Sequence, residues 1–347
     1  MVRLAATGPN VRTGDSTMTT GVRAVSVNAP ARLHLGFLDM NGSAGRRFGS
    51  VGLALEGPRV ELSIRRAAPL AISGGQSARA RSFANTMRGQ FNLPDDFQID
   101  IARTIPEHAG LGSGTQLGIA VGVALARLYR LDLSIREIAR VVQRGQRSGI
   151  GAGAFELGGF LVDGGKGDSD EPPPIVSRID FPAHWRILLV LQRSSLGLHG
   201  EREAAVFQAL PAFPEAVAGH LCRVMLMQAL PALAERDIAG FGNAIGELQR
   251  ITGDYFAPAQ GGRFASPAVA EALAWIESQG IAGVGQSSWG PTGFAIVDGE
   301  DRAFALATAA RSRWSEAGAL QFMVCGGRNK GGTAEPVPAA ALSAKAN

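Results

Sequence analysis

Alternating apolar and polar positions predict β-strands over much of the N-terminal third of the chain. Side chains on a strand point to the two faces of a sheet in turn, so a period of two marks a half-buried strand. This pattern predicts strands at residues 22–39, 50–55, 59–65 and 97–103. Pro58 separates the second strand from the third, because proline has no N–H to give to a sheet.

Polar candidates gather on one face of the first predicted strand. Leu33, Leu35 and Phe37 lie on one side of it, so Arg32 and His34 point to the other side. We expect this pair to bind a carboxylate or a phosphate of a ligand. A structural pair on the sheet is the alternative.

The loop after this strand carries three more charged candidates. Asp39 either lies beside a cationic ligand centre or an arginine, or forms a turn with Asn41 and Gly42. Arg46 and Arg47 suit a phosphate, because guanidinium is permanently charged and fork-shaped. We expect one of the two arginines to be merely solvated.

Helical spacing predicts the next elements. Residues 77–91 have a helical pattern, and the small apolar side chains of residues 117–129 predict a buried helix. Ser134 and Glu137 stand at capping-box spacing, so they open a helix that ends near residue 145.

The second half of the chain mixes helices and strands, which indicates an α+β fold. Strands are predicted at residues 185–192, 292–297 and 320–325, and helices at residues 196–203, 214–230, 231–249, 266–279 and 303–317. We divide the chain into a disordered tail (1–21), an N-terminal domain (22–184), a C-terminal domain (185–332) and a flexible tail (333–347).

Composition narrows the class of protein. Of the 347 residues 46% are hydrophobic and 18% are charged, which allows a large aliphatic core. The net charge of +4 is scattered, so no nucleic acid is expected as a partner. We find no secretory signal and no uninterrupted apolar stretch of membrane-spanning length. With only two cysteines, Cys222 and Cys325, a reduced cytoplasmic protein is expected.

The stretch from residue 105 to residue 116 carries the strongest chemical signal. It is rich in glycine and lies between a predicted strand and a predicted helix, whose unpaired N-terminal N–H groups attract anions. We expect it to bind phosphate or pyrophosphate, and a plain turn is the alternative. The candidate phosphate-binding residues are Gly110, Gly112, Ser113, Gly114, Thr115 and Gln116. His108 is a candidate proton donor, or else a solvated loop histidine.

Two further Gly-rich segments carry polar candidates. Arg147 and Ser148 begin a predicted loop at residues 147–154, ahead of a predicted strand pair or bulged strand at 155–163, and they bind phosphate if this loop faces the first. In the segment around residue 287 the candidate substrate-binding residues are Gln286, Ser287, Ser288 and Trp289. Trp289 either walls an aromatic ligand or belongs to the core. Asn329 offers one more donor, or lies in a frayed end.

Three segments, in this order along the chain, resemble motifs of the GHMP kinase superfamily, named after galactokinase, homoserine kinase, mevalonate kinase and phosphomevalonate kinase. They are residues 29–32, 106–115 and 283–292. The resemblance implies a two-domain GHMP-kinase-like α+β fold. Its N-terminal domain is ribosomal-protein-S5-like, and its C-terminal domain is ferredoxin-like α/β.

The chain also departs from the kinase pattern. Kinases of this superfamily often carry Ser-Gly-Ile-Asp, whose aspartate acts as the base, where this chain has Gly151 at the fourth position. Residues 31–43, 46–52 and 285–291 instead resemble the β-ribofuranosylaminobenzene 5′-phosphate synthases, a non-kinase branch of the superfamily.

This second resemblance implies a decarboxylating phosphoribosyl transferase of tetrahydromethanopterin biosynthesis. Its substrates are 4-aminobenzoate and 5-phosphoribosyl 1-pyrophosphate, and it releases CO2 and pyrophosphate. Mg²⁺ is expected, ATP is not required, and a homodimer is expected. Arg32, His34, Asp39 and His108 are then the catalytic candidates. An ATP-dependent small-molecule kinase and a non-catalytic phosphate-sensing module are the alternatives.

Overall fold

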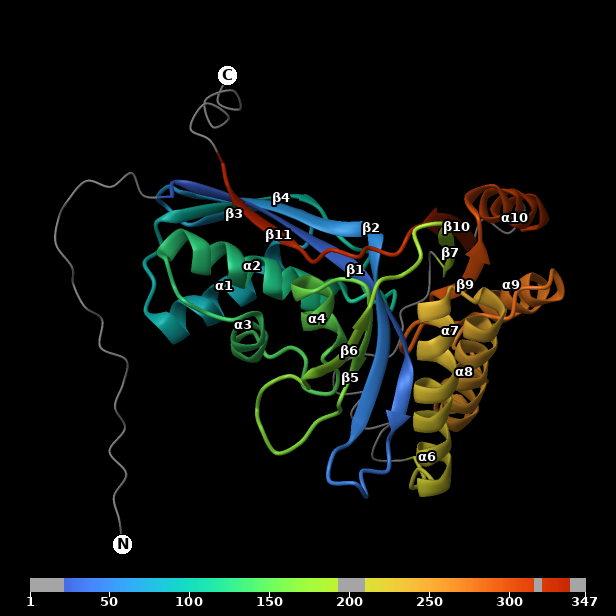
Figure 1. The fold of residues 1–347 in the computed structure, drawn as a ribbon. Helices are drawn as coiled ribbons and strands as arrows, with labels where there is room; N and C mark the ends of the chain where they lie inside the picture. The colour runs from blue at the N-terminus through green and yellow to red at the C-terminus, as the bar shows by residue number, and fades with distance from the viewer. Residues whose placement is uncertain (1–21, 193–209, 315–319, 338–347) are drawn as a thin grey trace, which may run out of the picture.

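The computed structural model describes residues 22–192, 210–314 and 320–337, and its strands form two sheets (Figure 1). Helices pack on both sheets, so the predicted α+β class is confirmed. The predicted N-terminal tail at residues 1–21 and the predicted helix at residues 196–203 lie outside the described part.

The first sheet has seven strands, in the order β11-β1-β2-β4-β3, with β5 paired to β2 and β6 paired to β5. The strands are β1 (Ala24–Asp39), β2 (Phe48–Arg66), β3 (Ala71–Gly74), β4 (Phe97–Arg103), β5 (Phe160–Asp163), β6 (Ile175–Ile179) and β11 (Thr333–Pro336). The helices are α1 (Ser77–Phe91), α2 (Ser113–Tyr129), α3 (Ile135–Val141) and α4 (Ile150–Glu156), and α1, α2 and α3 lie on one face of the sheet (Figure 1).

Small residues let α2 lie at the centre of this helical layer. A Cβ on Gly122 would come within 2.3 Å of Cγ2 of Ile138 on α3, so only glycine fits there. Ser134 caps α3 as predicted, and Glu137 completes the capping box. The helix ends at Val141, four residues before the predicted end.

The predicted break at Pro58 is wrong, because β2 is one strand from Phe48 to Arg66. On one edge β2 pairs with β5 at residues 51–53 and with β4 at residues 61–66. Pro58 therefore lies between the two partners, where no ladder hydrogen bond from its nitrogen is needed.

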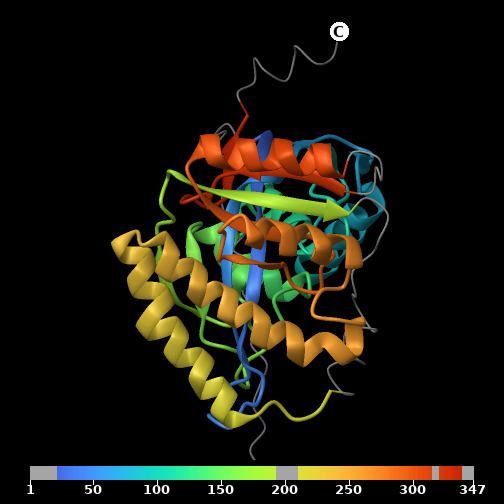
Figure 2. The same ribbon diagram turned by 90° about the vertical axis from the view of Figure 1, so that its right-hand side faces the viewer.

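The second sheet has the order β10-β7-β9-β8. Its strands are β7 (Trp185–Gln192), β8 (Val284–Gln286), β9 (Gly293–Asp298) and β10 (Leu320–Cys325), and the helices α9 (Pro267–Ser278) and α10 (Glu300–Arg313) cover its outer face (Figure 2). Successive side chains of β7 point to opposite faces of this sheet. Leu188 and Val190 pack with α9 and α10, while Ile187 and Leu189 join the main core.

A helical hairpin completes the second half (Figure 2). It consists of α6 (Glu215–Val224), a π-helical turn η1 (Met225–Ala229), α7 (Leu230–Glu235) and α8 (Ile238–Gln260). By length and overall composition Glu215–Glu235 is long and apolar enough to span a membrane, but Arg223 interrupts its apolar run. Its buried side chains, such as Leu221 and Leu233, belong to the main core, whereas Leu226 and Met227 are exposed.

The segment predicted as a second Gly-rich loop is mostly helical. Residues 150–156 form α4, so the expected loop at 147–154 and strand pair at 155–163 are wrong, apart from the short β5. The glycines serve close packing instead. A Cβ on Gly153 would come within 2.7 Å of Cδ1 of Ile175 on β6.

After β10 the chain returns to the first sheet. Arg328 N–H donates to the carbonyl of Ala54, and Gly159 N–H donates to the carbonyl of Arg328. Residues 333–336 then form β11 beside β1, with Val25 opposite Pro336. The prediction of a flexible tail from residue 333 is therefore wrong for this strand, and the C-terminal segment belongs partly to the N-terminal sheet.

Candidate functional site

The first strand at His34, the Gly-rich loop and the segment around residue 287 meet at one place, where Ser287 joins them. The hydroxyl of Ser287 donates to the carbonyl of Gly110 (2.8 Å) and accepts from the backbone N–H of His34 (3.0 Å). The N–H of Ser288 donates to the carbonyl of His34 (3.1 Å). Ser287 is fully buried, so it links the segments and does not offer its hydroxyl to a ligand.

A polar recess, which we call the phosphate part, lies at the N-terminus of α2. It is lined by Arg79, His108, Gly110, Gly112, Ser113, Gly114, Thr115, Arg144, Ser288, Trp289 and Gly290. No Asp or Glu is among these residues. The first-turn N–H groups of α2 have no partner within the helix, so an anion fits there.

Close approach to backbone requires glycine at position 110 of this loop, and a left-handed conformation favours glycine at position 112. Gly112 caps α2 with φ of 83°, a left-handed conformation that favours glycine. A Cβ on Gly110 would lie 2.3 Å from the carbonyl oxygen of Ser287, and one on Gly114 would lie 2.1 Å from Nη2 of Arg79. The predicted loop thus brings bare backbone against its neighbours.

Two arginines of the phosphate part were not predicted from the sequence. Arg79 comes from α1, and Arg144 follows α3. Burial and the nearby charge of Arg79 lower the pKa of Arg144, whose Nε has no hydrogen-bond partner among the described residues. Arg79 also pairs with Glu107 at 3.7 Å. Two cations held together beside a helix N-terminus suit a multiply charged anion. No spacing in the sequence signals either residue.

Arg32 supports the loop from behind. Its Nη1 donates to the carbonyl of Gly110 at 2.5 Å, and a Cβ on Gly112 would lie 3.2 Å from Cγ of Arg32. Arg32 is not among the residues that line the phosphate part. Its position therefore favours a structural role over the predicted ligand contact.

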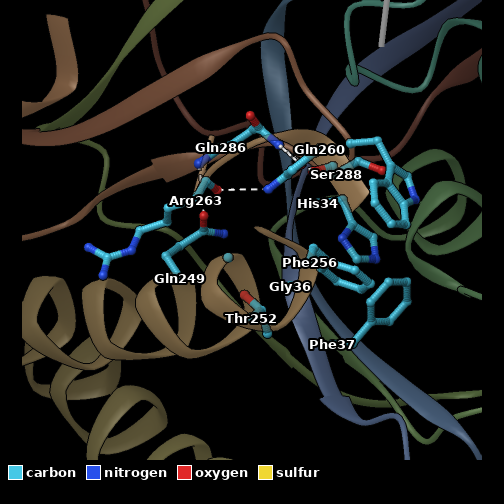
Figure 3. A pocket seen from close by; sticks show the side chains of 12 residues that line it. His34, Gly36, Phe37, Gln249, Thr252, Phe256, Gln260, Arg263, Gln286 and Ser288 are labelled. Atoms are coloured by element: carbon cyan, nitrogen blue, oxygen red, sulfur yellow. Dashed lines mark hydrogen bonds between the residues drawn. The ribbon is translucent and has the colours of Figure 1, made fainter. Parts of the chain in front are cut away.

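A second recess, which we call the aromatic part, lies next to the first (Figure 3). It is lined by His34, Gly36, Phe37, Gln249, Thr252, Gly253, Phe256, Gln260, Arg263, Gln286, Ser288 and Trp289. The Phe256 and Trp289 ring centroids are 4.4 Å apart, and those of His34 and Phe37 are 4.6 Å apart. Ser288 and Trp289 line both parts, so the two recesses adjoin.

Glutamines brace the aromatic part. Gln249 donates to the carbonyl of Leu35 (2.5 Å) and accepts from the N–H of Gln286 (2.8 Å). The side-chain oxygen of Gln286 accepts from the N–H of Ala265 (2.7 Å). Gln286 thus lines the predicted site, but its amide oxygen is engaged with Ala265 and its amide nitrogen donates to Oε1 of Gln260 on α8 (3.3 Å). None of the α8 residues was predicted.

His34 is the most strongly perturbed group of the site. It is 3% exposed, and burial, helped by the charge of Arg32, lowers the pKa of His34 to about 3. The ring is therefore neutral at physiological pH. Its Nε2 is buried without a hydrogen-bond partner among the described residues.

The structure also explains why Gly151 stands where a base was expected. A Cβ there would lie 2.6 Å from Cγ2 of Thr115, so no carboxylate fits. Gln116 donates from Nε2 to the carbonyl of Gly151 (2.8 Å) and is fully buried. Gln116 therefore anchors α4 to α2 and is withdrawn from the predicted phosphate ligands, whereas Thr115 lines the recess as expected.

Three charged residues near the first loop lie outside both recesses. Asp39 accepts from the N–H groups of Asn41 (2.8 Å) and Gly42 (2.9 Å), so the turn alternative describes it and a catalytic role does not. Arg46 donates to the carbonyls of residues 164 and 165, and Arg47 donates to that of residue 40. Neither arginine lines the phosphate part.

Ser148 and Asn329 have structural positions, and Arg147 lies outside both recesses. The hydroxyl of Ser148 accepts from the N–H of Ile150 at 3.2 Å, and Arg147 beside it lines neither recess. Asn329 exchanges hydrogen bonds with the backbone of Phe181 at 2.7 and 2.9 Å. These contacts fix α4 and the returning chain.

Comparison with known proteins agrees with this architecture. Residues 78–159 match the family described as GHMP kinases N terminal domain, and residues 229–316 match GHMP kinases C terminal. The mevalonate diphosphate decarboxylase structure from Staphylococcus aureus superposes with a TM-score of 0.64 at 14% identity, over 90% of this chain and 98% of that one, which shows the shared fold.

Curated relatives decide the family. The β-ribofuranosylphenol 5′-phosphate synthase of Methanothermobacter thermautotrophicus is 32% identical over 88% of this chain and 97% of its own length. The chain belongs to this family. The synthase of the same name from Archaeoglobus fulgidus is also 32% identical, over the same two shares. The suspected resemblance to the non-kinase branch is thus confirmed.

Proposed function

We propose that this β-ribofuranosylphenol 5′-phosphate synthase family member joins a para-substituted benzoate to 5-phosphoribosyl 1-pyrophosphate. One observation carries the proposal: a Gly-rich anion recess with two arginines adjoins an aromatic-walled recess through Ser288 and Trp289. The diphosphate would occupy the first recess and the benzoate ring the second.

The chemistry needs these two recesses and no strong base. The C1–O bond of the ribose breaks, and its electron pair leaves with the pyrophosphate. The ring carbon that bears the carboxylate bonds to C1, and the bond to the carboxylate then breaks. CO2 departs, and the released electron pair restores the aromatic ring. Donors aimed at the leaving diphosphate stabilise the developing charge.

This account fits the position of Gly151. A kinase needs a group that accepts the proton of the attacking hydroxyl, whereas here CO2 is lost in place of a proton. Neither recess is lined by an Asp or Glu among the described residues. This observation favours the transferase over the kinase alternative.

The aromatic acid is proposed as a class. The resemblance read from the sequence implies 4-aminobenzoate, while the relatives' name denotes a phenol product, which corresponds to a 4-hydroxybenzoate. Both acids carry an electron-releasing para group that makes the reacting carbon nucleophilic. We propose 4-aminobenzoate as the substrate and 4-hydroxybenzoate as its closest competitor.

We propose that Mg²⁺ arrives on the diphosphate. Among the described residues no group of three or more His, Cys, Asp or Glu side chains is placed to hold a metal ion. Ser113 and Thr115 line the phosphate part beside the expected position of the diphosphate. Mg²⁺ is commonly held through substrate phosphates with few protein oxygens.

We further propose a cytoplasmic homodimer. Cys222 and Cys325 are both free thiols, which suits a reducing compartment. Light scattering on the protein as it elutes from a size-exclusion column should give twice the mass of one chain. The mass of a single chain would contradict the dimer.

The function is tested by product analysis. The protein is incubated with 5-phosphoribosyl 1-pyrophosphate, Mg²⁺ and either acid. The products are then separated and identified by mass spectrometry. We expect a decarboxylated aryl riboside 5′-phosphate without added ATP. ATP-dependent phosphorylation of a small molecule, with no riboside from either acid, would favour the kinase instead.

A further inference from the structure

His34 is fixed in the aromatic part with one ring nitrogen unpaired. Its backbone is held on both sides, because the N–H donates to Ser287 and the carbonyl accepts from Ser288. Its ring makes a T-shaped contact with that of Phe37, with centroids 4.6 Å apart (Figure 3). Nε2 is buried and has no partner among the described residues. A buried nitrogen in this state costs free energy that a ligand can recover.

The protonation state of the ring decides which ligand group fits. The pKa of about 3 keeps His34 neutral, and the ring bonds to the backbone of His34 itself. Nδ1 is the ring nitrogen nearer the backbone and Nε2 has no partner among the described residues, so we assign this bond and the ring hydrogen to Nδ1. Nε2 then presents a lone pair, which accepts from an O–H or N–H donor and repels a carboxylate.

The two recesses fix which end of the acid reaches His34. The reacting ring carbon and its carboxylate must face the ribose, on the side of Ser288 and Trp289, which line both recesses. His34 lines only the aromatic part. The para substituent, at the opposite end of the ring, is the polar group left to meet it.

We infer that Nε2 of His34 accepts a hydrogen bond from the para substituent of the aromatic acid, and that His34 thereby selects acids with a donor at this position. The inference rests on the proposed function, and it replaces the expected contact of His34 with a carboxylate or phosphate. His34 is then a specificity-determining residue, and 4-amino and 4-hydroxy groups both satisfy it.

The test compares the affinity of two pairs of acids for the full-length protein, measured calorimetrically in the presence of pyrophosphate. 4-Aminobenzoate and 4-hydroxybenzoate carry a hydrogen-bond donor at the para position, whereas 4-methoxybenzoate and benzoate carry none. Each pair compares one acid of the first kind with one of the second. Wild-type protein should prefer the donor acids about tenfold, the effect of one buried hydrogen bond. His34→Leu should reduce the preference to about onefold. His34→Gln, which keeps an acceptor, should retain most of it.

The surface variant His184→Leu is the matched control and should keep the tenfold preference, since His184 is about half exposed. If His34→Leu does not fold, the wild-type series and His34→Gln still decide. Equal affinities in wild-type protein, or an unchanged preference in His34→Leu, would overturn the inference and leave the proposed function standing. If no acid binds to wild-type protein, the acceptor class fails, and the inference fails with it.

Discussion

At the scale of the residue, the phosphate part depends on side chains that no motif contains. Arg79 and Arg144 flank the N-terminus of α2, and the lowered pKa of Arg144 reflects both its burial and the neighbouring cation. Glu107 partly neutralises Arg79 at 3.7 Å, and a multiply charged anion bound beside the two arginines would neutralise Arg144 as well.

Removal of one arginine should therefore weaken anion binding. We expect Arg144→Ala to raise the Kd for pyrophosphate about ten- to a hundredfold, because a hydrogen bond to a charged group is worth about 1.5–3 kcal/mol. Arg46→Ala is the control and should bind normally, since Arg46 contacts the carbonyls of residues 164 and 165. Calorimetric titration checks both variants, and equal affinities would exclude Arg144 from the site.

The buried histidine has a measurable effect on stability. The pKa of His34 is about 3 in the fold and 6.5 in the unfolded chain, so between these values the unfolded chain binds a proton that the fold excludes. The stability that the neutral His34 ring gives the fold is intact above pH 6.5 and is lost as the pH falls toward 3. Between these two values the free energy of unfolding changes by up to about 1.4 kcal/mol per pH unit.

Urea unfolding of wild-type protein and His34→Gln between pH 4.5 and 7.5 isolates this contribution. The free energy of unfolding should fall more steeply with decreasing pH in wild-type protein, because glutamine does not titrate. Parallel curves for the two proteins would show that His34 is not held neutral.

At the scale of the element, α4 shows why composition alone misleads. Its glycines predict a loop, yet Gly151 and Gly153 lie in a helix that packs closely against Thr115 and Ile175. Glycine in a helix costs about 1 kcal/mol relative to alanine, so its presence here reflects lack of space.

A double substitution tests this explanation. Gly151→Ala should lower the free energy of unfolding by about 1–2 kcal/mol, because the clash with Thr115 exceeds the gain in helix preference. In the Thr115→Ser background, which removes the clashing Cγ2, the same change should be neutral or stabilising. Chemical denaturation of the four proteins measures the coupling. Additive effects would mean that the contact is not the reason for the glycine.

The sequence predicts some helices and strands better than others. The long alternation of β1 and the small-residue run of α2 were sufficient to predict both, because each pattern spans many residues. The short edge strands β3 and β6 have no fully buried residue and carry no comparable pattern. The strand β11 was missed because only pairing with a strand at the other end of the chain defines it.

At the scale of the whole molecule, the site is a product of tertiary structure. The sequence located the phosphate loop and the segment at Ser288 and Trp289, since local motifs specify them. It could not supply the walls that come from distant helices, such as Phe256 on α8 and Arg79 on α1. It also predicts a ligand contact for Asn329, whose polar side chain instead bonds the backbone of Phe181 and holds the returning chain in place.

The central claim is that one cleft couples loss of pyrophosphate to loss of CO2. Carboxyl-labelled 4-aminobenzoate or 4-hydroxybenzoate, supplied with 5-phosphoribosyl 1-pyrophosphate and Mg²⁺ in the absence of ATP, tests it most directly. We predict that, with at least one of these acids, labelled CO2 and pyrophosphate appear in equal amounts and only when both substrates are present. Pyrophosphate release without labelled CO2, or no release with either acid, would contradict the account.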